Sequence, residues 1–371
     1  MGKEFDLRLT QISASTDTKL GGPSSVVINT HGLLNQKLGS YKLLVFGESR
    51  ISGPRVFKTK TILNNRFGFF CNIFSPSLIH NLRNSEVLLI HGYYLFSTLY
   101  SIAIFRGKKI FLMPHGTFEK YQKARHTIRK SIFSTLLRCF LKNRQIHFIT
   151  ASHSEVESLR DSFPHNEITV VGLGVEIPPD ALIEEHRNEE IRLIFVGRVV
   201  VKKRVDLCLQ AVKFLRTNGH NVSLRIIGAG SSALREDLLN LVEELDLSAH
   251  VKFLGHMEKD AISVELSKAD VFLLPSENEN FAIAVAESIA ALVPVIVSNQ
   301  VSMHTFVDKH KVGVTISELN SNLLGQAVLQ IIKDYDEFRE NCKNCRNLLS
   351  WNEVFNTWMD VIALKVDRGI L

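Results

Sequence analysis

Two glutamates in the segment LLPSENENFAIAVAESIAALVPVIVSN, residues 273–299, carry the most chemical information in this chain. Glu279 follows an apolar run that ends at Pro275, and Glu287 lies eight residues later in an Ala-rich helical pattern. If the gap is helical, a rise of about 1.5 Å per residue separates the two backbones by roughly 12 Å. Carboxylates that flank one glycosidic bond lie about 5–9.5 Å apart, which disfavours a hydrolase pair. The spacing favours two separate contacts with one long ligand.

Cations gather where another apolar run ends. Gly197-Arg198 closes the run, and Lys202-Lys203-Arg204 opens the next helical pattern. A guanidinium and an ammonium at one strand end can neutralise a diphosphate. A solvated basic helix start has the same sequence, although cations at a helix N-terminus oppose the helix dipole. The unfavourable placement favours a bound anion there.

Two short glycine segments also follow predicted strands. In Gly21-Gly22-Pro23-Ser24-Ser25, glycines before a helix would let backbone N–H groups approach a phosphate, although an ordinary tight turn would look similar. Gly228-Ala229-Gly230 is better interpreted as a packing turn.

Two histidines each precede a glycine at a predicted strand end, in LLIHGYY and LMPHGTF. Ligands of parallel α/β folds bind at the carboxyl ends of the strands, which favours a functional role for His115. For His91, a functional role and a structural role remain equally open.

The composition is that of a folded, two-domain protein with an anionic partner. Its 371 residues suffice for two domains with separate cores. The apolar share of 45% and the charged share of 22% are ordinary for a globular protein. A net charge of +6 favours nucleotide phosphates, anionic lipid or nucleic acid as the partner.

Several features lead us to expect a cytoplasmic protein. The five cysteines form no secreted disulfide framework, and Cys342 and Cys345 are interpreted as reduced bystander thiols. The start, MGKEFDLRLTQIS, lacks an apolar core of signal-peptide length. Residues 87–105 carry no formal charge, but His91-Gly92 interrupts them, so we expect a buried strand, a loop and a buried helix rather than a transmembrane span.

Short apolar runs alternate with helical patterns, which is typical of parallel α/β layers. The sequence predicts two Rossmann-like domains in tandem, joined by the Pro-rich and acidic segment VEIPPDALIEEHRNEE, with a ligand cleft at the strand ends. The predicted strands are 7–13, 42–46, 87–90, 110–113, 147–150 and 168–171, then 193–196, 224–227, 251–254, 271–274, 295–297 and 314–316. After residue 317 only helical patterns remain.

A basic region extends from Arg106 to Arg144, with eleven Lys or Arg and one acid, Glu119. Apolar residues interleave at helical spacing, so residues 120–144 either contact an anionic membrane surface or form an ordinary helix with a basic outer face. No nucleic-acid module accompanies the charge, which disfavours nucleic acid as the partner. Asp334-Tyr335-Asp336 matches the DxD of metal-dependent sugar transferases, but it lies between helical patterns and is interpreted as a coincidence.

Taken together, the motifs resemble those of retaining glycosyltransferases of family 4 (glycosyl transferases group 1), which have the GT-B fold. FVGRVVVKKRVD is similar to the glycine-arginine and lysine signature, and ENENFAIAVAE to the two-glutamate motif. GGPSS, PHGTF and ITVVGLGVEIP resemble the glycine loop, the acceptor-domain histidine and the interdomain crossing. The resemblance covers nearly the whole chain and is best over residues 191–313.

This resemblance implies an architecture and a site. Two Rossmann-like domains, 1–178 for the acceptor and 179–350 for the donor, would face a central cleft, and a C-terminal helix, 351–371, would return to the first domain. In the donor domain, cations would bind the diphosphate, Glu279 and the amides after it the sugar, and Glu287 the ribose. The implied donor-binding residues are Gly22, Arg198, Lys203, Gly255, His256, Asn280, Phe281, Ala282 and Glu287, and the implied catalytic residues are His115 and Glu279.

The resemblance also implies an activity. The expected enzyme is a metal-independent hexosyltransferase without a cofactor, which moves a sugar from a UDP- or GDP-sugar to a glycan or lipid-linked acceptor in cell-surface polysaccharide biosynthesis. It would be cytoplasmic, with the basic region as its contact with the inner face of the membrane. A GT-B nucleotide-sugar epimerase and a non-catalytic membrane- or partner-binding relative remain alternatives. An epimerase would turn over the donor alone, and a non-catalytic relative would lack nucleotide affinity.

The sequence departs from the family pattern at several positions. Lys202 stands where an acid is common and Leu173 where asparagine is common. Arg204, Ala282 and Leu292 stand where glycines are common. The acid expected near Thr305 is missing, so the chain is a divergent member in which the charged donor residues are intact.

Overall fold

The protein, seen in a computed structural model, consists of two compact units. The structure describes residues 7–17, 22–47, 49–58, 76–107, 109–118, 127–141, 144, 146–180 and 190–367. The first unit comprises residues 1–173 and 354–371, and the second comprises residues 174–353. Parts of the sequence predictions lie outside the described residues. They are Gly21, much of the proposed linker (181–189), and Lys108, Glu119, Lys120, Lys123, Arg125 and Lys142 of the basic region.

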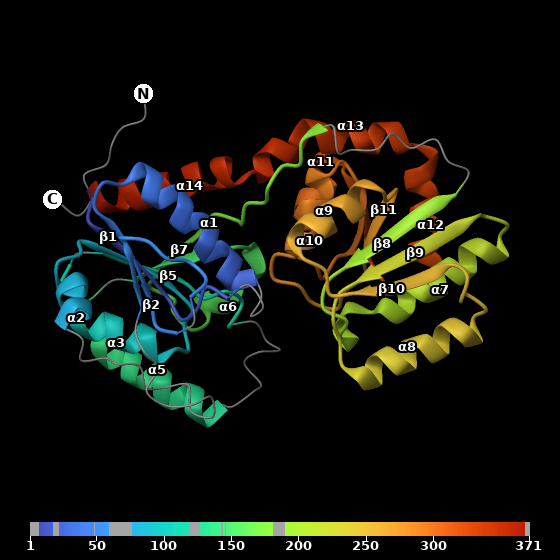
Figure 1. The fold of residues 1–371 in the computed structure, drawn as a ribbon. Coiled ribbons are helices and arrows are strands. Elements are labelled where there is room, and N and C mark those ends of the chain that lie inside the picture. The colour runs from blue at the N-terminus through green and yellow to red at the C-terminus, as the bar shows by residue number, and fades with distance from the viewer. Residues whose placement is uncertain are drawn as a thin grey trace. The chain divides into compact units, whose positions relative to one another are not determined.

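The first unit is built on a seven-stranded parallel sheet (Figure 1). Its strand order is β3-β2-β1-β4-β5-β6-β7. Successive strands are therefore added on one side of β1 up to β3, and on its other side from β4 onward. In this architecture the point of reversal is where ligands bind, beyond the carboxyl ends of the strands. The strands are β1 (Leu9–Ser13), β2 (Tyr41–Val45), β3 (Val56–Lys58), β4 (Val87–His91), β5 (Lys109–Met113), β6 (Ile146–Thr150) and β7 (Glu167–Val170).

Helices cover both faces of this sheet, which is why its central strands are buried along their whole length. In Figure 1, α2, α3 and α5 lie together on one side, and α14 runs beside α1. Lys37 at the end of α1 donates a hydrogen bond to Asn356 of α14 at 3.0 Å. The helices are α1 (Gly22–Lys37), α2 (Pro76–Arg83), α3 (Phe96–Ile104), α5 (Thr127–Leu141), α6 (His153–Arg160) and α14 (Trp351–Asp367).

The second unit is a six-stranded parallel sheet with the order β10-β9-β8-β11-β12-β13. The order in which its strands are added reverses between β8 and β11. The predicted cations follow β8, and Glu279 follows β11. The strands are β8 (Ile191–Val196), β9 (Val222–Ile227), β10 (Val251–Gly255), β11 (Val271–Leu274), β12 (Val295–Ser298) and β13 (Gly313–Ile316). The helices are α7 (Val205–Thr217), α8 (Ser232–Glu244), α9 (Lys259–Ser267), α10 (Ile283–Ala290), α11 (His304–His310), α12 (Ser321–Lys333) and α13 (Tyr335–Cys345), with short 3₁₀ turns η3 (Val201–Lys203) and η4 (Arg346–Leu349).

The predicted fold class of two Rossmann-like α/β domains is confirmed. Residues 87–105 form the expected strand, loop and helix, and none of the described helices combines the length and apolarity of a membrane span. Cys342 and Cys345 are buried free thiols. The sequence analysis missed β3, a three-residue edge strand that is too short for a periodic pattern. Asp334 and Asp336 lie at the start of α13, as expected for a coincidental motif.

Candidate donor site and the histidine cavity

Glycines allow the ends of β8 and β9 to approach each other closely. Gly197 follows β8 with φ +155°, and Gly228 follows β9 with φ +145°. A Cβ atom on Gly228 would stand 1.8 Å from the Gly197 carbonyl oxygen, so no other residue fits there without a backbone shift. The predicted packing role of Gly228 is consistent with this contact. It leaves Arg198 exposed directly at the strand end.

Two lysines of η3 converge on one carboxylate. Lys203 Nζ lies 3.1 Å from Glu279 Oε1, and Lys202 Nζ lies 3.5 Å from the same oxygen. Lys202 Nζ also donates to the Asn278 carbonyl oxygen at 2.8 Å, and Ser276 Oγ donates to Glu279 Oε1 at 3.1 Å. Lys203 and Glu279 are largely buried, with side chains 12% and 13% exposed. The fold therefore brings together residues that are 76 positions apart in the chain.

The charge of this cluster is positive. Burial lowers the pKa of Lys203, and repulsion from Lys202 and Arg198 lowers it further, whereas Glu279 opposes the shift. Three cations (Arg198, Lys202 and Lys203) face one carboxylate (Glu279), which leaves two positive charges without an anionic partner in the cluster. A bound anion would relieve the repulsion between the cations. We call these four residues the cationic cluster.

The segment after Glu279 is a loop rather than a continuation of a helix. The backbone of Glu279 pairs with residues 300–302: its N–H donates to the Gln300 carbonyl oxygen at 3.3 Å, and its own carbonyl oxygen accepts from Ser302 Oγ at 3.1 Å. Asn280 and Phe281 continue the loop, and α10 begins only at Ile283. The expected helical gap of eight residues is therefore wrong, and Glu287 lies little more than one turn inside α10. The Ala-rich pattern did not show that the backbone leaves the helical region at Ala282.

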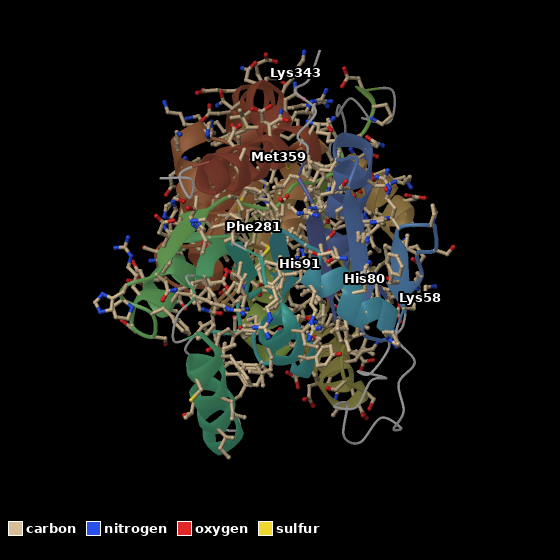
Figure 2. All side chains as sticks on the ribbon, turned by 90° about the vertical axis from the view of Figure 1, so that its left-hand side faces the viewer. Lys58, His80, His91, Phe281, Lys343 and Met359 are labelled. Carbon is tan, nitrogen blue, oxygen red and sulfur yellow. The ribbon has the colours of Figure 1, made fainter. Side chains whose placement is uncertain are left out.

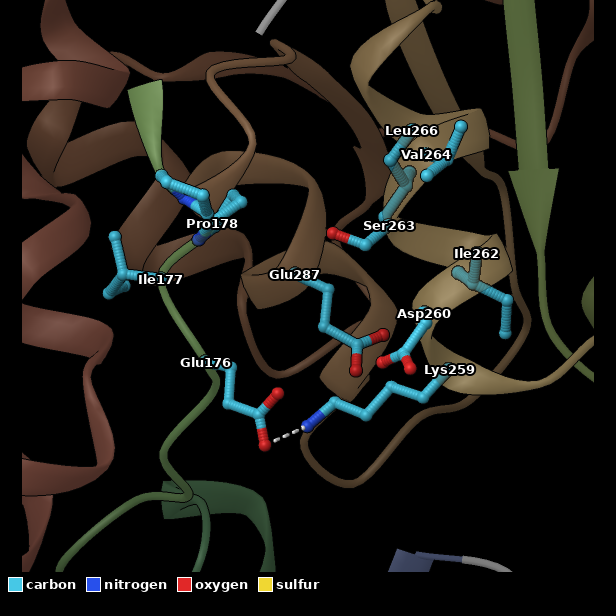
Figure 3. A pocket seen from close by; sticks show the side chains of 11 residues that line it. Glu176, Ile177, Pro178, Lys259, Asp260, Ile262, Ser263, Val264, Leu266 and Glu287 are labelled. Carbon is cyan, nitrogen blue, oxygen red and sulfur yellow. Dashed lines mark ion pairs between the residues drawn. The ribbon is translucent and has the colours of Figure 1, made fainter. Parts of the chain in front are cut away.

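Glu287 faces a cavity of about 290 Å³ within the second unit (Figure 3). Lys259 and Glu176 also line this cavity, and they form an ion pair at 2.9 Å. Burial raises the pKa of Glu287 to about 7, with Glu176 adding to the shift and Lys259 opposing it. Among the described residues, no ion pair or hydrogen bond joins Glu287 to the cationic cluster. The two glutamates therefore occupy separate environments.

The raised pKa of Glu287 has a consequence for stability. Between about pH 4.5 and 7 the folded protein holds a proton on Glu287 that the unfolded chain has released, so the free energy of unfolding falls as the pH rises through this window. We expect Glu287→Gln to lack this component. Its stability relative to the parent, measured by urea unfolding, should increase from pH 4.5 to 7 and level off above. Glu258→Gln, at an exposed position before α9, is the control, and a flat difference for Glu287→Gln would contradict the assignment.

Gly255 ends β10 and His256 follows it, at the same edge of the sheet. Gly255 has φ +73°, and its carbonyl oxygen accepts a hydrogen bond from the Gly228 N–H at 2.7 Å. His256 is exposed. These residues therefore border the ends of β9 and β10, and no described contact joins His256 to the cationic cluster.

The three residues that stand where the resemblance predicts glycines all have left-handed backbones. The φ angles are +53° for Arg204, +60° for Ala282 and +59° for Leu292. The backbone geometry that glycine adopts freely is therefore present here in residues with side chains, at a cost of about 1–2 kcal/mol each.

Replacing Ala282 by glycine should stabilise the protein. Glycine removes the steric strain at φ +60°, and this gain exceeds the extra backbone entropy of the unfolded chain, for a net effect of about 1 kcal/mol. The matched control is Ala286→Gly inside α10, which should destabilise by about 1 kcal/mol because glycine weakens a helix interior. Thermal or urea unfolding of both variants measures the difference. A loss of stability in Ala282→Gly would contradict this account of the strain.

In the first unit, His91 and His115 lie in contact. His91 Nδ1 and His115 Nε2 are 3.0 Å apart, and the two rings are nearly parallel. Figure 2 shows His91 in the interior of this unit, whereas His80 on α2 faces outward. Both contacting histidines line a cavity of about 290 Å³, which we call the histidine cavity. Gly22 begins α1, and the next residues, Pro23 and Ser24, line the same cavity.

Both histidines are neutral at pH 7. Burial lowers the pKa of His115 to about 4. Burial also lowers the pKa of His91 well below its ordinary value, and a charge on His115 would lower it further. A neutral imidazole has one N–H donor and one bare nitrogen, so it can donate a hydrogen bond to a ligand without carrying charge.

Sequence reasoning missed the residues that hold this pair. Trp358 of α14 stacks on His91 with 6.2 Å between ring centroids. The amide of Gln11 on β1 lies 2.9 Å from His91 Nε2, and the buried Glu155 accepts from the Gly116 N–H next to His115. The one signal for Gln11 was a polar side chain within the fully buried strand LTQIS.

Comparison with known proteins supports the family-level interpretation. Residues 180–346, nearly the whole second unit, match the family model described as Glycosyl transferases group 1. An uncharacterized glycosyltransferase of Methanocaldococcus jannaschii is 27% identical over 187 residues, which are 49% of this chain and 47% of that protein. The chain thus spans about half the length of this relative. The amylovoran biosynthesis glycosyltransferase AmsK of Erwinia amylovora is 22% identical over 75% of this chain and 70% of its own length.

Solved structures share the fold over nearly the whole chain. HepE of Anabaena, solved in complex with UDP and glucose, superposes with a TM-score of 0.71 at 12% identity, covering 96% of this chain and 99% of HepE. Other glycosyltransferase structures show the same likeness. The chain therefore has the GT-B fold, and its second unit matches the family model of the glycosyl transferases group 1.

Proposed function

We propose that the protein is a retaining glycosyltransferase that moves a sugar from a nucleoside-diphosphate donor to a glycan or lipid-linked acceptor of a cell-surface polysaccharide. The observation that carries the proposal is the cationic cluster, which lies in the part of the chain that matches the group 1 family. Relatives that act in amylovoran and colanic acid biosynthesis support the polysaccharide context.

In this proposal the cationic cluster binds the donor diphosphate. Two positive charges without an anionic partner, one of them an exposed guanidinium at a strand end, match the charge and geometry of two linked phosphates. Because side chains supply this neutralisation, the proposed reaction needs no divalent metal. HepE, which shares the fold, was solved in complex with UDP, and this supports a nucleotide as a ligand of this chain.

The two glutamates have different tasks in this proposal. Glu279, together with the amides of Asn280, Phe281 and Ala282, holds the donor sugar, since it lies against the cations that bind the phosphates. Glu287 accepts hydrogen bonds from ribose hydroxyls, and Gly255 and His256 line the base. The separate environments of the two carboxylates support this division, because one carboxylate is bound to cations and the other lines a separate cavity.

His115 and the start of α1 serve the reacting centre in this proposal. His115 is a neutral hydrogen-bond donor in the histidine cavity, and the helix start at Gly22 favours negative charge. Both can contact oxygens of a sugar or a phosphate. No covalent role is needed for His115.

Donor turnover tests the function. The protein is incubated with a panel of UDP-, GDP- and ADP-sugars, with and without glycan or lipid-linked acceptors, and ³¹P and ¹H NMR follow the nucleotide and the anomeric protons. The proposal expects release of a nucleoside diphosphate that depends on an acceptor, with the anomeric configuration retained in the product. Conversion of the donor without an acceptor would identify an epimerase, and the absence of any turnover or binding would identify a non-catalytic relative.

We further propose that the basic region 120–144 brings the first unit to an anionic membrane surface. Three large apolar side chains of α5, each four residues from the next, are exposed: Ile132 by 58%, Leu136 by 47% and Phe140 by 46%. Leu137 on the same helix is buried, so α5 packs against the core with one face and leaves a second apolar face open. An exposed apolar stripe on a helix rich in Lys and Arg matches an interfacial membrane helix better than a solvated basic face.

Binding to anionic vesicles should therefore depend on both charge and the apolar stripe. Each cation near the surface contributes about 1 kcal/mol, screened over about 10 Å at 0.1 M salt. We expect co-sedimentation with anionic vesicles that weakens as salt rises and is absent with neutral lipid. Reversal of Lys123, Arg129 and Lys130 to glutamate should abolish it, and Phe140→Ser should weaken it. Leu239→Ser, at an exposed apolar position of α8, is the matched control, and binding that ignores salt would contradict the proposal.

A further inference from the structure

A chain of buried and part-buried hydrogen bonds crosses the first unit and ends at the histidine cavity. It starts at His31 of α1, whose Nδ1 lies 3.0 Å from the Tyr41 hydroxyl. The Tyr41 hydroxyl bonds to Gln11 Oε1, the Gln11 amide nitrogen lies 2.9 Å from His91 Nε2, and His91 Nδ1 lies 3.0 Å from His115 Nε2. These five residues come from α1, β2, β1, β4 and the loop after β5.

The donors and acceptors in this chain follow from its surroundings. Thr30 Oγ1 donates its proton to the Val26 carbonyl oxygen at 2.7 Å, so it accepts from the Gln11 amide nitrogen at 2.8 Å. The NH₂ group of Gln11 therefore points to this side, where its second hydrogen reaches His91 Nε2. Its carbonyl oxygen accepts from Tyr41, which in turn must accept from His31 Nδ1. Every donor points toward the histidine cavity.

This order determines the tautomer of each histidine. Because His91 Nε2 accepts from Gln11, the neutral His91 carries its proton on Nδ1. His91 Nδ1–H then donates to His115 Nε2, so the neutral His115 carries its own proton on Nδ1. Among the described residues nothing accepts that proton, and His115 lines the histidine cavity. The opposite tautomer would place the N–H of His91 against the NH₂ of Gln11.

We infer that Gln11 is a positioning residue, which acts through His91 to hold His115 as an Nδ1–H donor toward a ligand oxygen in the histidine cavity. Under the proposed function, on which the identity of the ligand rests, that oxygen belongs to the sugar or phosphate of the substrate. A ring with its proton on Nε2 would instead present a bare nitrogen and repel the same oxygen.

Other contacts keep the chain rigid. Trp358 stacks on His91 at an interplanar angle of 19°, and the His91 and His115 rings are inclined by 22°. His115 has φ +56°, and the buried Glu155 holds the next backbone N–H. A side chain held by packing and hydrogen bonds loses little entropy when it binds, which is the usual purpose of such support around a reactive group.

The test is the tautomer of His115 itself, read from ¹⁵N chemical shifts of the full-length protein labelled at histidine. We expect a protonated Nδ1 and a bare Nε2 for both His91 and His115. Gln11→Met keeps the length of the side chain but removes the N–H donor to His91 Nε2. A thioether cannot donate a hydrogen bond and is only a weak acceptor. The inference expects both tautomers to invert in this variant, so that His115 Nε2–H donates to His91. Tyr41→Phe keeps the Gln11 donor and should keep the tautomer.

A protonated Nε2 on His115 in the parent protein, or no change in a folded Gln11→Met variant, would overturn the inference. Where turnover is measured, Gln11→Met should lower kcat at least tenfold with an unchanged KM for the donor, and Tyr335→Phe in α13 serves as the control. The two proposals fail separately. If the predicted tautomers are found but there is no turnover, the proposed enzymatic function is wrong and the inference about the hydrogen-bond chain stands. If there is turnover but His115 has the opposite tautomer, the inference is wrong and the proposed function stands.

Discussion

We expect Lys203→Ala to raise the dissociation constant for the donor nucleotide at least tenfold, which corresponds to about 1.4 kcal/mol. This is the largest effect on binding that we predict. Lys203 Nζ lies within 3.2 Å of the position that a Cβ on Gly197 would occupy, so its charge stands directly at the end of β8. Its removal takes one of three cations from the site that is proposed to bind two phosphates. The effect exceeds that of an exposed ion pair because the side chain is largely buried.

Calorimetry with the free nucleoside diphosphate measures this effect. Lys213→Ala, on α7 of the same unit, is the control and should bind as the parent does. Glu279→Gln should keep the affinity for the free nucleotide and lose turnover, because the carboxylate is assigned to the sugar. An Ala variant of Lys203 with parental affinity would remove the diphosphate from the cationic cluster.

His115→Ala should lower turnover by about 100-fold and leave nucleotide affinity unchanged. Removal of one preorganised donor to a charge that develops in the transition state typically costs this much. The predicted separation of the two effects follows from the fold, because His115 belongs to the first unit and the cationic cluster to the second. Steady-state kinetics with the donor, together with calorimetry, separates kcat from binding.

The exposed His80 on α2 provides the control for this variant, and His80→Ala should retain full turnover. Activity should also survive EDTA, since side-chain cations are assigned the role of a metal. Unchanged turnover in a folded His115→Ala protein would exclude His115 from the reacting centre. Loss of activity on chelation would show that the cationic cluster is not sufficient.

The strand pattern predicted the two sheets because each buried parallel strand is a short apolar run, as in VLLI of β4 and VFLL of β11. The cations and Glu279 could be placed near one another for the same reason, since both follow strands that end at one edge. The ion pair between Lys203 and Glu279 was not predictable from the sequence. The two residues are 76 positions apart, and their contact depends on how η3 orients the Lys203 side chain.

Other features lay beyond sequence reasoning for identifiable physical reasons. The left-handed backbone at Ala282 has no local signal, because alanine favours helices and the strain is imposed by the surrounding loop. The helical gap between Glu279 and Glu287 was overestimated for that reason. Gln11 stood out only as a polar residue in a buried strand, and its partners Tyr41 and His91 lie 30 and 80 residues away.

The central claim, a nucleoside diphosphate at the cationic cluster, is tested most directly by ligand-dependent unfolding. UDP, GDP and ADP are each added to the parent protein and to Lys203→Ala, and stability is measured by thermal or urea unfolding. A nucleotide at 100 times its dissociation constant should add about 2.7 kcal/mol to the parent, and the gain should shrink in the variant. A parent protein that none of the three nucleotides stabilises, or an equal gain in parent and variant, would contradict the account.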